Sequence, residues 1–365
     1  MRISLKLLVL FTIVSATATA PVAAPAVAPT LIGPALSSIG PLAFGPEGVL
    51  YAADRQAATI FALDLGSLAS ATTPGTADVA GISQKIAGLL GTAPTEVAIT
   101  DVAVHPTSRN TFVAVMRGLG ATAQPALLRV DGAGRLDVLS LDAVKYTSVA
   151  LPNPAAVTTT GRGGRMQSVT DLAFSNGRLF VAGLSNEEFA SKLWSVTYPF
   201  SSADRGTSVE IFHGNHGRLE TRSPVMAFLP LSIDNQPHLV AGYTCTPLVK
   251  FPVTSLQPGQ KIVGRTIAEL GAGNQPLDMI AYQKDGRQFL LMSNSTRGVM
   301  KIPTAGFAAA SPIEAPVPNG TAGVPFETVS SLTGVEQLDA LDSGRAVVVS
   351  RTQDGTRNLA AVALP

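Results

Sequence analysis

The sequence predicts an all-β protein folded as a six-bladed β-propeller of four-stranded antiparallel blades. Three observations predict this fold. A phrase of three short apolar strands recurs six times along the chain. Further strand candidates lie between several of the copies, where a fourth blade strand belongs. The 365 residues include 34 Gly and 26 Pro, which indicates many turns and few long helices.

Each copy of the phrase has an apolar strand, a polar turn, a second strand, a loop and a third strand. The equivalent positions are 41, 101, 171, 225, 278 and 337, at intervals of 53 to 70 residues. Candidate fourth strands are 136–139, 208–212 and 261–270. Regular units of one kind favour a propeller over a sandwich or two smaller domains. Seven blades are the alternative count, because the 70-residue interval has room for another hairpin.

Two segments outside the phrase complete the predicted architecture. Residues 30–36 precede the first copy and have the character of a fourth strand. We expect them to pair with the last copy and close the ring, which would protect two exposed strand edges. Ile82, Ile86, Leu89 and Leu90 follow helical periodicity and predict one helical insertion after the first copy.

The composition excludes some classes of protein. The chain is 46% hydrophobic and 14% charged, which is typical of a folded domain with a large core. The net charge of +1 lacks the basic excess of a nucleic-acid-binding protein, so no nucleic-acid partner is expected. The chain has a single cysteine, Cys245, so no intrachain disulfide can form.

The N-terminus predicts export. Residues 1–20 combine a basic start, an apolar stretch and small residues, which is typical of a signal peptide cleaved after Ala18. A membrane anchor is the alternative, but the apolar stretch is shorter than the roughly 20 residues that a span needs. Residues 21–29 form a Pro/Ala linker, and residues 30–365 form a single propeller domain. We therefore expect a periplasmic or secreted protein with no stable membrane span after cleavage.

Three innermost strands begin with an aspartate, namely Asp101, Asp171 and Asp278. Innermost strands start on one face of the ring, so these carboxylates could converge on the mouth of the central channel. Converging like charges would call for a cation or basic partner groups. The alternative is structural, because aspartate at a strand start also accepts hydrogen bonds from nearby backbone N–H groups.

Polar loops are expected on the same face. The longest concentration, residues 213–222, is rich in Gly and holds two histidines three residues apart, two arginines and a glutamate. A His pair near Glu could bind a metal or exchange protons, and a solvated loop is the alternative. Cys245 could be a nucleophile or a small buried apolar residue. Besides the three aspartates, the candidate ligand-binding residues are His213, His216, Arg218, Arg222, Asn186, Glu187, Asn294 and Arg297.

The phrase in residues 171–182, Asp-Leu-Ala-Phe-Ser-Asn-Gly-Arg-Leu-Phe-Val-Ala, resembles bacterial six-bladed propellers of the NHL-repeat and gluconolactonase (SMP-30) superfamily. Uncharacterised exported members are similar. In the lactonases of this superfamily, Glu, two Asn and Asp hold a divalent metal at the channel mouth. The resemblance therefore implies a divalent cation such as calcium at the same place here. Asp278 matches that Asp and is the one metal ligand implied here. Ile39 stands where the family has Glu before Gly-Pro.

Two functional hypotheses follow. The first is an exported propeller that binds a small molecule or protein partner on its loop-rich face. The second is a metal-dependent hydrolase of the lactonase type, with a cation near Asp278, Asp171 and Asp101. A redox partner in a quinoprotein-like system is a third possibility with no cofactor motif behind it. No cofactor follows from the residues alone.

Overall fold

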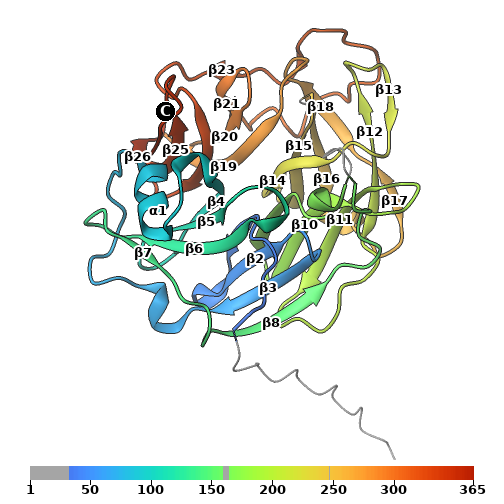
Figure 1. Ribbon diagram of the computed structural model, residues 1–365. Helices are drawn as coiled ribbons and strands as arrows, with labels where there is room; N and C mark the ends of the chain where they lie inside the picture. Colours follow the sequence, from blue (N-terminus) through green and yellow to red (C-terminus); the bar gives the residue numbers. More distant parts are fainter. Residues whose placement is uncertain (1–32, 159–163, 246) are drawn as a thin grey trace, which may run out of the picture.

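The structure is a computed structural model that describes residues 33–158, 164–245 and 247–365. The predicted signal peptide and linker lie outside the described residues. Six mainly antiparallel sheets surround a central axis, so the predicted six-bladed propeller is confirmed (Figure 1). Within the described ranges, none of the helices combines the length and hydrophobicity that crossing a bilayer requires.

The blades are numbered I to VI by the order of their innermost strands along the chain. The three inner strands of every blade fall where the sequence predicts them. Blade I contains β1 (Leu42–Phe44), β2 (Leu50–Asp54), β3 (Thr59–Asp64) and β8 (Lys145–Ala150). Blade II contains β4 (Val97–Val104), β5 (Thr111–Arg117), β6 (Gln124–Val130) and β7 (Leu136–Val138). Blade III contains β9 (Asp171–Ser175), β10 (Arg178–Leu184), β11 (Ser191–Thr197) and β12 (Thr207–His213), with β13 (Arg218–Glu220) at its edge.

The second half of the chain follows the same plan. Blade IV contains β14 (Val225–Ile233), β15 (Gln236–Tyr243), β16 (Pro247–Pro252), β18 (Arg265–Glu269) and the short β22 (Ala322–Gly323). Blade V contains β19 (Pro276–Lys284), β20 (Arg287–Asn294), β21 (Gly298–Pro303) and β23 (Glu327–Thr328). Blade VI contains β24 (Val335–Ala340), β25 (Arg345–Arg351) and β26 (Arg357–Ala363).

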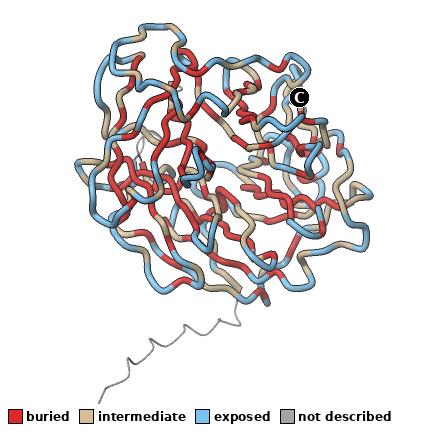
Figure 2. Tube along the Cα trace, turned by 180° about the vertical axis from the view of Figure 1, so that it is seen from behind, coloured by how far each residue is buried: buried red, intermediate tan, exposed pale blue. Residues whose placement is uncertain are grey.

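The second strand of each blade is mainly apolar because it is buried on both faces. In β2, Leu50 and Ala52 pack against blade II, whereas Tyr51 and Ala53 pack against blade III. Successive side chains of a strand point to opposite faces, so one strand contributes to two cores. Burial follows the strands and exposure follows the loops between them (Figure 2).

The order of the blades around the ring differs from their order in the sequence. Separate hydrophobic clusters join blade I to blades II and III, and another joins blade II to blade VI. The remaining clusters join III to IV, IV to V and V to VI. The spatial order is therefore II, I, III, IV, V, VI. Blade II sits between the first and last blades of the sequence repeat.

This order corrects the predicted ring closure by residues 30–36. Among the described residues of that segment, Gly33 donates its N–H to the Asp142 carbonyl, far from the last blade. The edge of blade VI is instead met by Val79, which exchanges two backbone hydrogen bonds with Leu359. The chain leaves blade I after β3, passes blade VI, builds blade II and returns as β8. The long interval that suggested a seventh blade holds this returning strand.

Two further predictions have clear outcomes. The helix is confirmed as α1 (Ile82–Leu90), which buries Ile82 and Ile86 and lies beside β26 (Figure 1). The fourth strand predicted over 261–270 is divided in two. β17 (Lys261–Val263) pairs in parallel with β12 of blade III, and β18 belongs to blade IV. Gly264 lies between them, at a close approach where a Cβ would lie 2.3 Å from the Phe251 ring.

Candidate functional site

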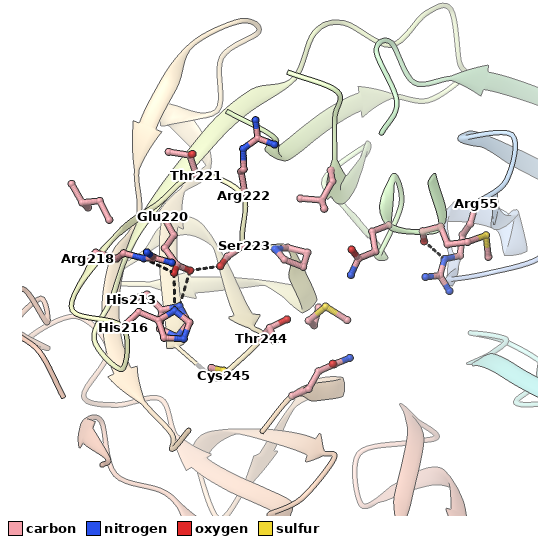
Figure 3. A pocket seen from close by; sticks show the side chains of 17 residues that line it. Arg55, His213, His216, Arg218, Glu220, Thr221, Arg222, Ser223, Thr244 and Cys245 are labelled. Carbon is pink, nitrogen blue, oxygen red and sulfur yellow. Dashed lines mark hydrogen bonds and ion pairs between the residues drawn. The ribbon is translucent and has the colours of Figure 1, made fainter. Parts of the chain in front are cut away.

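A cavity of about 790 Å³ opens on the face where the innermost strands begin, called the loop face below (Figure 3). Its walls come from the β12–β13 hairpin, the segment leading into β14, the end of β15 and the Arg55 region of blade I. Four of the predicted ligand-binding residues line it: His213, His216, Arg218 and Arg222.

The β12–β13 hairpin brings the two histidines together. His213 ends β12, pairs with Arg218 of β13, and its carbonyl accepts the N–H groups of His216 and Gly217. Gly217 has φ of 64°, a left-handed conformation that glycine adopts without strain. The turn places the imidazole rings of His213 and His216 with their centroids 3.9 Å apart. Beneath the turn, the buried Glu269 accepts the Gly214 N–H at 2.5 Å.

Glu220 holds both imidazoles. Its Oε2 lies 2.8 Å from Nδ1 of His213, and its Oε1 lies 2.7 Å from Nδ1 of His216 (Figure 3). Ser223 Oγ also donates to Oε2, and Arg218 Nε lies 3.3 Å from Oε1. Burial acts to raise the pKa of Glu220, but the hydrogen bonds from His213, Ser223 and His216 outweigh it and hold that pKa well below its usual range. Glu220 is therefore a carboxylate that accepts from both rings.

The side chains of His213, His216 and Cys245 converge. One potential metal-ligating atom from each lies within 4.8 Å of the others. His213 is 1% exposed, and its Nε2 is buried without a hydrogen-bond partner. Cys245 follows β15 of the neighbouring blade, with φ of 62°, and its N–H donates to the Asn274 carbonyl at 2.8 Å. A non-glycine residue in this conformation is uncommon.

The charge lining the cavity is mainly positive. Arg55, Arg218 and Arg222 line it, and Glu220 is the one acidic residue among the described lining residues. Arg55 faces the hairpin from the opposite wall, where its Nε donates to the Met166 carbonyl at 2.6 Å (Figure 3). Arg218 pairs with Glu220 at 3.3 Å, so Arg55 and Arg222 are the lining arginines that have no ion pair with a described carboxylate.

The three predicted aspartates lie in the channel, along a second cavity of about 440 Å³. Each accepts the N–H of the next residue and one N–H from the innermost strand of an adjacent blade. The adjacent donors are Leu42 for Asp101 at 2.6 Å, and Phe228 for Asp171 and Leu338 for Asp278, both at 2.7 Å. These bonds match the structural alternative from the sequence, in which aspartate accepts from backbone N–H groups.

Asp339 makes the same contact and was missed in the sequence. Its carboxylate accepts the N–H groups of Ala340 and of Val104 in blade II. Asp339 stands two positions further along its strand than the other aspartates, so its side chain points to the same face of the sheet. This spacing could have revealed it in the sequence. Burial raises the pKa of Asp171 to about 7 and of Asp339 to about 6, and burial also raises the pKa values of Asp101 and Asp278.

The remaining predicted residues are engaged away from the loop-face cavity. Glu187 pairs with the buried Lys192 at 2.8 Å and with Arg205 at 3.7 Å. Asn186 donates its N–H to the Asn153 carbonyl, and the buried Asn294 accepts from Asn274. Arg297 reaches the Ala272 carbonyl. Ser223 and Glu269, by contrast, support the hairpin and carry no sequence motif that could have revealed them.

No family model and no curated protein matches this chain. Among solved structures, the PQQ-bound aldose sugar dehydrogenase of Streptomyces coelicolor is similar with 11% identity and a TM-score of 0.36, over 91% of this chain and 95% of that one. A putative glucose dehydrogenase of Thermus thermophilus has 14% identity and a TM-score of 0.33, over 91% and 98%. The periplasmic gluconolactonase of Pseudomonas aeruginosa has 17% identity and a TM-score of 0.31, over 71% and 70%.

Proposed function

We propose that this protein binds a small anionic molecule, bearing a carboxylate or phosphate group, in the loop-face cavity. The observation that carries the proposal is the uneven charge of the cavity wall. Arg55 and Arg222 line it, while the carboxylate of Glu220 is already engaged with His213, His216 and Arg218. Guanidinium groups bind carboxylates and phosphates through paired hydrogen bonds.

The shape of the cavity supports a small molecule over a protein partner. Its volume of about 790 Å³ lies within the usual range for small-molecule sites. Walls from blades I, III and IV surround it, so a ligand would contact several blades at once. A flat protein-docking surface would not have this concave form.

Ligand screening by thermal unfolding tests the proposal. Citrate, gluconate and phosphate are the anionic probes, and sorbitol and glucose are neutral probes of similar size. A ligand at about 100 times its Kd stabilises the folded state by about 2.7 kcal/mol, so binding should raise Tm measurably. Arg55→Ala and Arg222→Ala should each abolish the shift, whereas Arg297→Ala, outside the cavity, should not. Equal shifts from neutral and anionic probes would overturn the proposal.

The alternative of a lactonase-type hydrolase draws less support from the contacts. It would place a cation beside Asp278, where both carboxylate oxygens accept backbone N–H groups. Ca²⁺ takes roughly 6 to 8 oxygen ligands, and the backbone groups around these oxygens are donors. The assignment of Asp278 as a metal ligand stays a prediction, which crystals grown with Ca²⁺ would test.

We also propose that the protein acts outside the cytoplasm, on the N-terminal pattern of residues 1–20. Mass spectrometry of the mature protein from a bacterial periplasmic fraction checks this. The expected N-terminus is Thr19, after cleavage at Ala18. An uncleaved chain recovered from the cytoplasm would contradict export.

A further inference from the structure

We infer that Nε2 of His213, Nε2 of His216 and Sγ of Cys245 form a binding site for a thiophilic transition-metal cation of the Zn²⁺ and Cu⁺ class. The fourth coordination position would face the loop-face cavity. The inference deepens the proposed function and rests on it in part, because an anionic ligand in the cavity could then reach the metal as well as the arginines.

The first argument is the donor set. Two imidazoles and one thiolate are ligands that zinc and copper prefer, whereas Ca²⁺ and Mg²⁺ prefer oxygen. One ring nitrogen of each histidine and Sγ of Cys245 lie within 4.8 Å of one another. Ligands of one tetrahedral zinc ion, bound at about 2.0–2.3 Å, stand roughly 3.3–3.8 Å apart. A small closing movement of the three side chains would therefore suffice.

The second argument is the orientation of the rings. Glu220 accepts from Nδ1 of both His213 and His216, at 2.8 and 2.7 Å. A carboxylate that accepts from Nδ1–H leaves the lone pair of Nε2 available for a metal, and metal-binding histidines are commonly held in this way. One carboxylate thus fixes the tautomer of both rings, and Ser223 holds the carboxylate in turn.

The third argument is the unpartnered nitrogen. His213 is 1% exposed, and its Nε2 is buried without a hydrogen-bond partner. A buried polar atom without a partner destabilises a folded protein unless something binds it. Here that nitrogen belongs to the group on which His216 and Cys245 converge. A metal would satisfy all three side chains at once.

The Gly-rich turn and the bend at Cys245 make this approach possible. The hairpin turn is held from below by Glu269, through the Gly214 N–H. Cys245 comes from blade IV and is held in its left-handed conformation by the hydrogen bond from its N–H to Asn274. The site thus joins blades III and IV. On binding, the Cys245 thiol would release its proton to solvent, and the imidazoles would stay neutral.

Titration with metal alone tests the inference. Metal-free protein is titrated with Zn²⁺, and separately with Cu⁺ under reducing conditions, against a chromophoric chelator, with Ca²⁺ as the oxygen-preferring comparison. We expect one equivalent of Zn²⁺ or Cu⁺ and no competition from Ca²⁺. Co²⁺ in place of Zn²⁺ should give a thiolate charge-transfer absorption that Cys245→Ser abolishes.

Matched variants separate metal binding from folding. His213→Ala and Cys245→Ser should each weaken Zn²⁺ binding by more than about 100-fold, beyond the loss usual for an outer-shell partner. His238→Gln changes a histidine on β15 outside the cavity and should leave the affinity unchanged. Cys245→Ser is nearly isosteric, so an unchanged Tm of its metal-free form would show that the fold persists.

Three results would overturn the inference: no stoichiometric metal, equal Zn²⁺ affinity in Cys245→Ser, or alkylation of Cys245 by iodoacetamide at the same rate with and without Zn²⁺. The last result would favour a free nucleophilic cysteine. The proposed function can fail independently. If citrate or phosphate still shifts Tm in Cys245→Ser, the arginine site stands without the metal; if Zn²⁺ binds but no anion does, the metal site stands alone.

Discussion

Asp278 in the channel and Glu220 on the loop face are both acidic residues of strands, but their hydrogen-bond donors differ. Asp278 accepts backbone N–H groups from its own blade and from blade VI. Glu220 accepts from the side chains of His213, His216 and Ser223. Backbone donors are fixed by the fold, so Asp278 holds blades together. Side-chain donors carry further chemistry, and Glu220 leaves the other nitrogen of each ring available.

The pKa values of the two regions are shifted in opposite directions, in line with their different hydrogen-bond donors. Burial raises the pKa values of the four channel aspartates, because backbone bonds do not offset the loss of solvation. At Glu220 the side-chain donors outweigh burial and lower the pKa. A cluster of carboxylates in a channel can thus be part of the architecture, while a single carboxylate beside two histidines can organise a binding site.

Outside the proposed metal ligands, the largest expected effect is at Glu220. Glu220→Ala should weaken Zn²⁺ binding by about 10- to 100-fold, as is usual when an outer-shell carboxylate is lost. The chelator competition titration measures this, and Co²⁺ should still show the thiolate absorption at higher concentration. Glu188→Ala, an exposed acid on the loop between β10 and β11, is the control and should change nothing. Equal weakening in both variants would show that general electrostatics, and not ring orientation, sets the affinity.

The second effect concerns the channel. Asp278→Ala leaves the N–H groups of Met279 and Leu338 without their acceptor, so we expect the free energy of unfolding to fall by about 2 kcal/mol. Denaturant unfolding measures this change. The control is Asp142→Ala, at an exposed position, whose free energy of unfolding should stay within about 0.5 kcal/mol of the wild type. Zn²⁺ affinity should not change. A stable Asp278→Ala protein that has lost its metal would reverse the assignment of the two regions.

The third prediction is the pH dependence of stability. Asp171 and Asp339 have pKa values raised to about 7 and about 6, so the folded protein holds their protons more tightly than the unfolded chain. The free energy of unfolding should therefore rise, by roughly 1 kcal/mol or more, as pH falls from about 7.5 to about 5.5. Burial lowers the pKa of His105, so this one group acts in the opposite direction and makes the folded protein less stable as the pH falls. Below about pH 4.5 the trend should reverse, because the unfolded chain then binds protons at Glu220 and Glu187, whose pKa values are lowered in the folded protein.

Thermal unfolding across this pH range measures the effect. The double variant Asp171→Asn with Asp339→Asn should have a lower Tm at every pH, since each amide loses one acceptor, and a flatter dependence between about pH 7.5 and 5.5. If the Tm of the wild type instead fell steadily as the pH was lowered from about 7.5, the channel carboxyls would be ionised in the folded protein without loss of stability.

The smallest effect is expected at Arg297, which the sequence places on the loop face but which lies outside the described cavity lining. Arg297→Ala should change neither Zn²⁺ nor citrate affinity by more than about 2-fold, and stability by no more than about 0.5 kcal/mol. Isothermal titration of both ligands checks this. A large loss of citrate binding would extend the site toward blade V.

The inner strands could be predicted because their signal is local. Each contributes apolar side chains to the core, so an apolar run followed by a polar turn marks it wherever its blade stands in the ring. Ring order could not be read in this way. The pairing of Val79 with Leu359, and of β8 with β3, joins segments distant in sequence, and their apolar residues would fit the edge of more than one blade.

The candidate site was predicted in part for the same reason. His213, His216 and Glu220 are close in sequence, so their spacing revealed them. Cys245 belongs to another blade, and only the packing of blade III on blade IV brings it near. One signal was available, since β12 and β15 both end on the loop face. Asp101, Asp171 and Asp278 were found by position and Asp339 was missed, because their hydrogen bonds to backbone depend on the neighbouring strand.

The position of a bound metal separates the hairpin site from the channel aspartates in one experiment. An anomalous difference map from crystals grown with Zn²⁺ and Ca²⁺ would show where each cation binds. We expect a zinc peak about 2.1 Å from Nε2 of His213 and of His216 and about 2.3 Å from Sγ of Cys245. A cation peak beside Asp278 in the channel, with none at the hairpin, would contradict the assignment of the metal site to the hairpin.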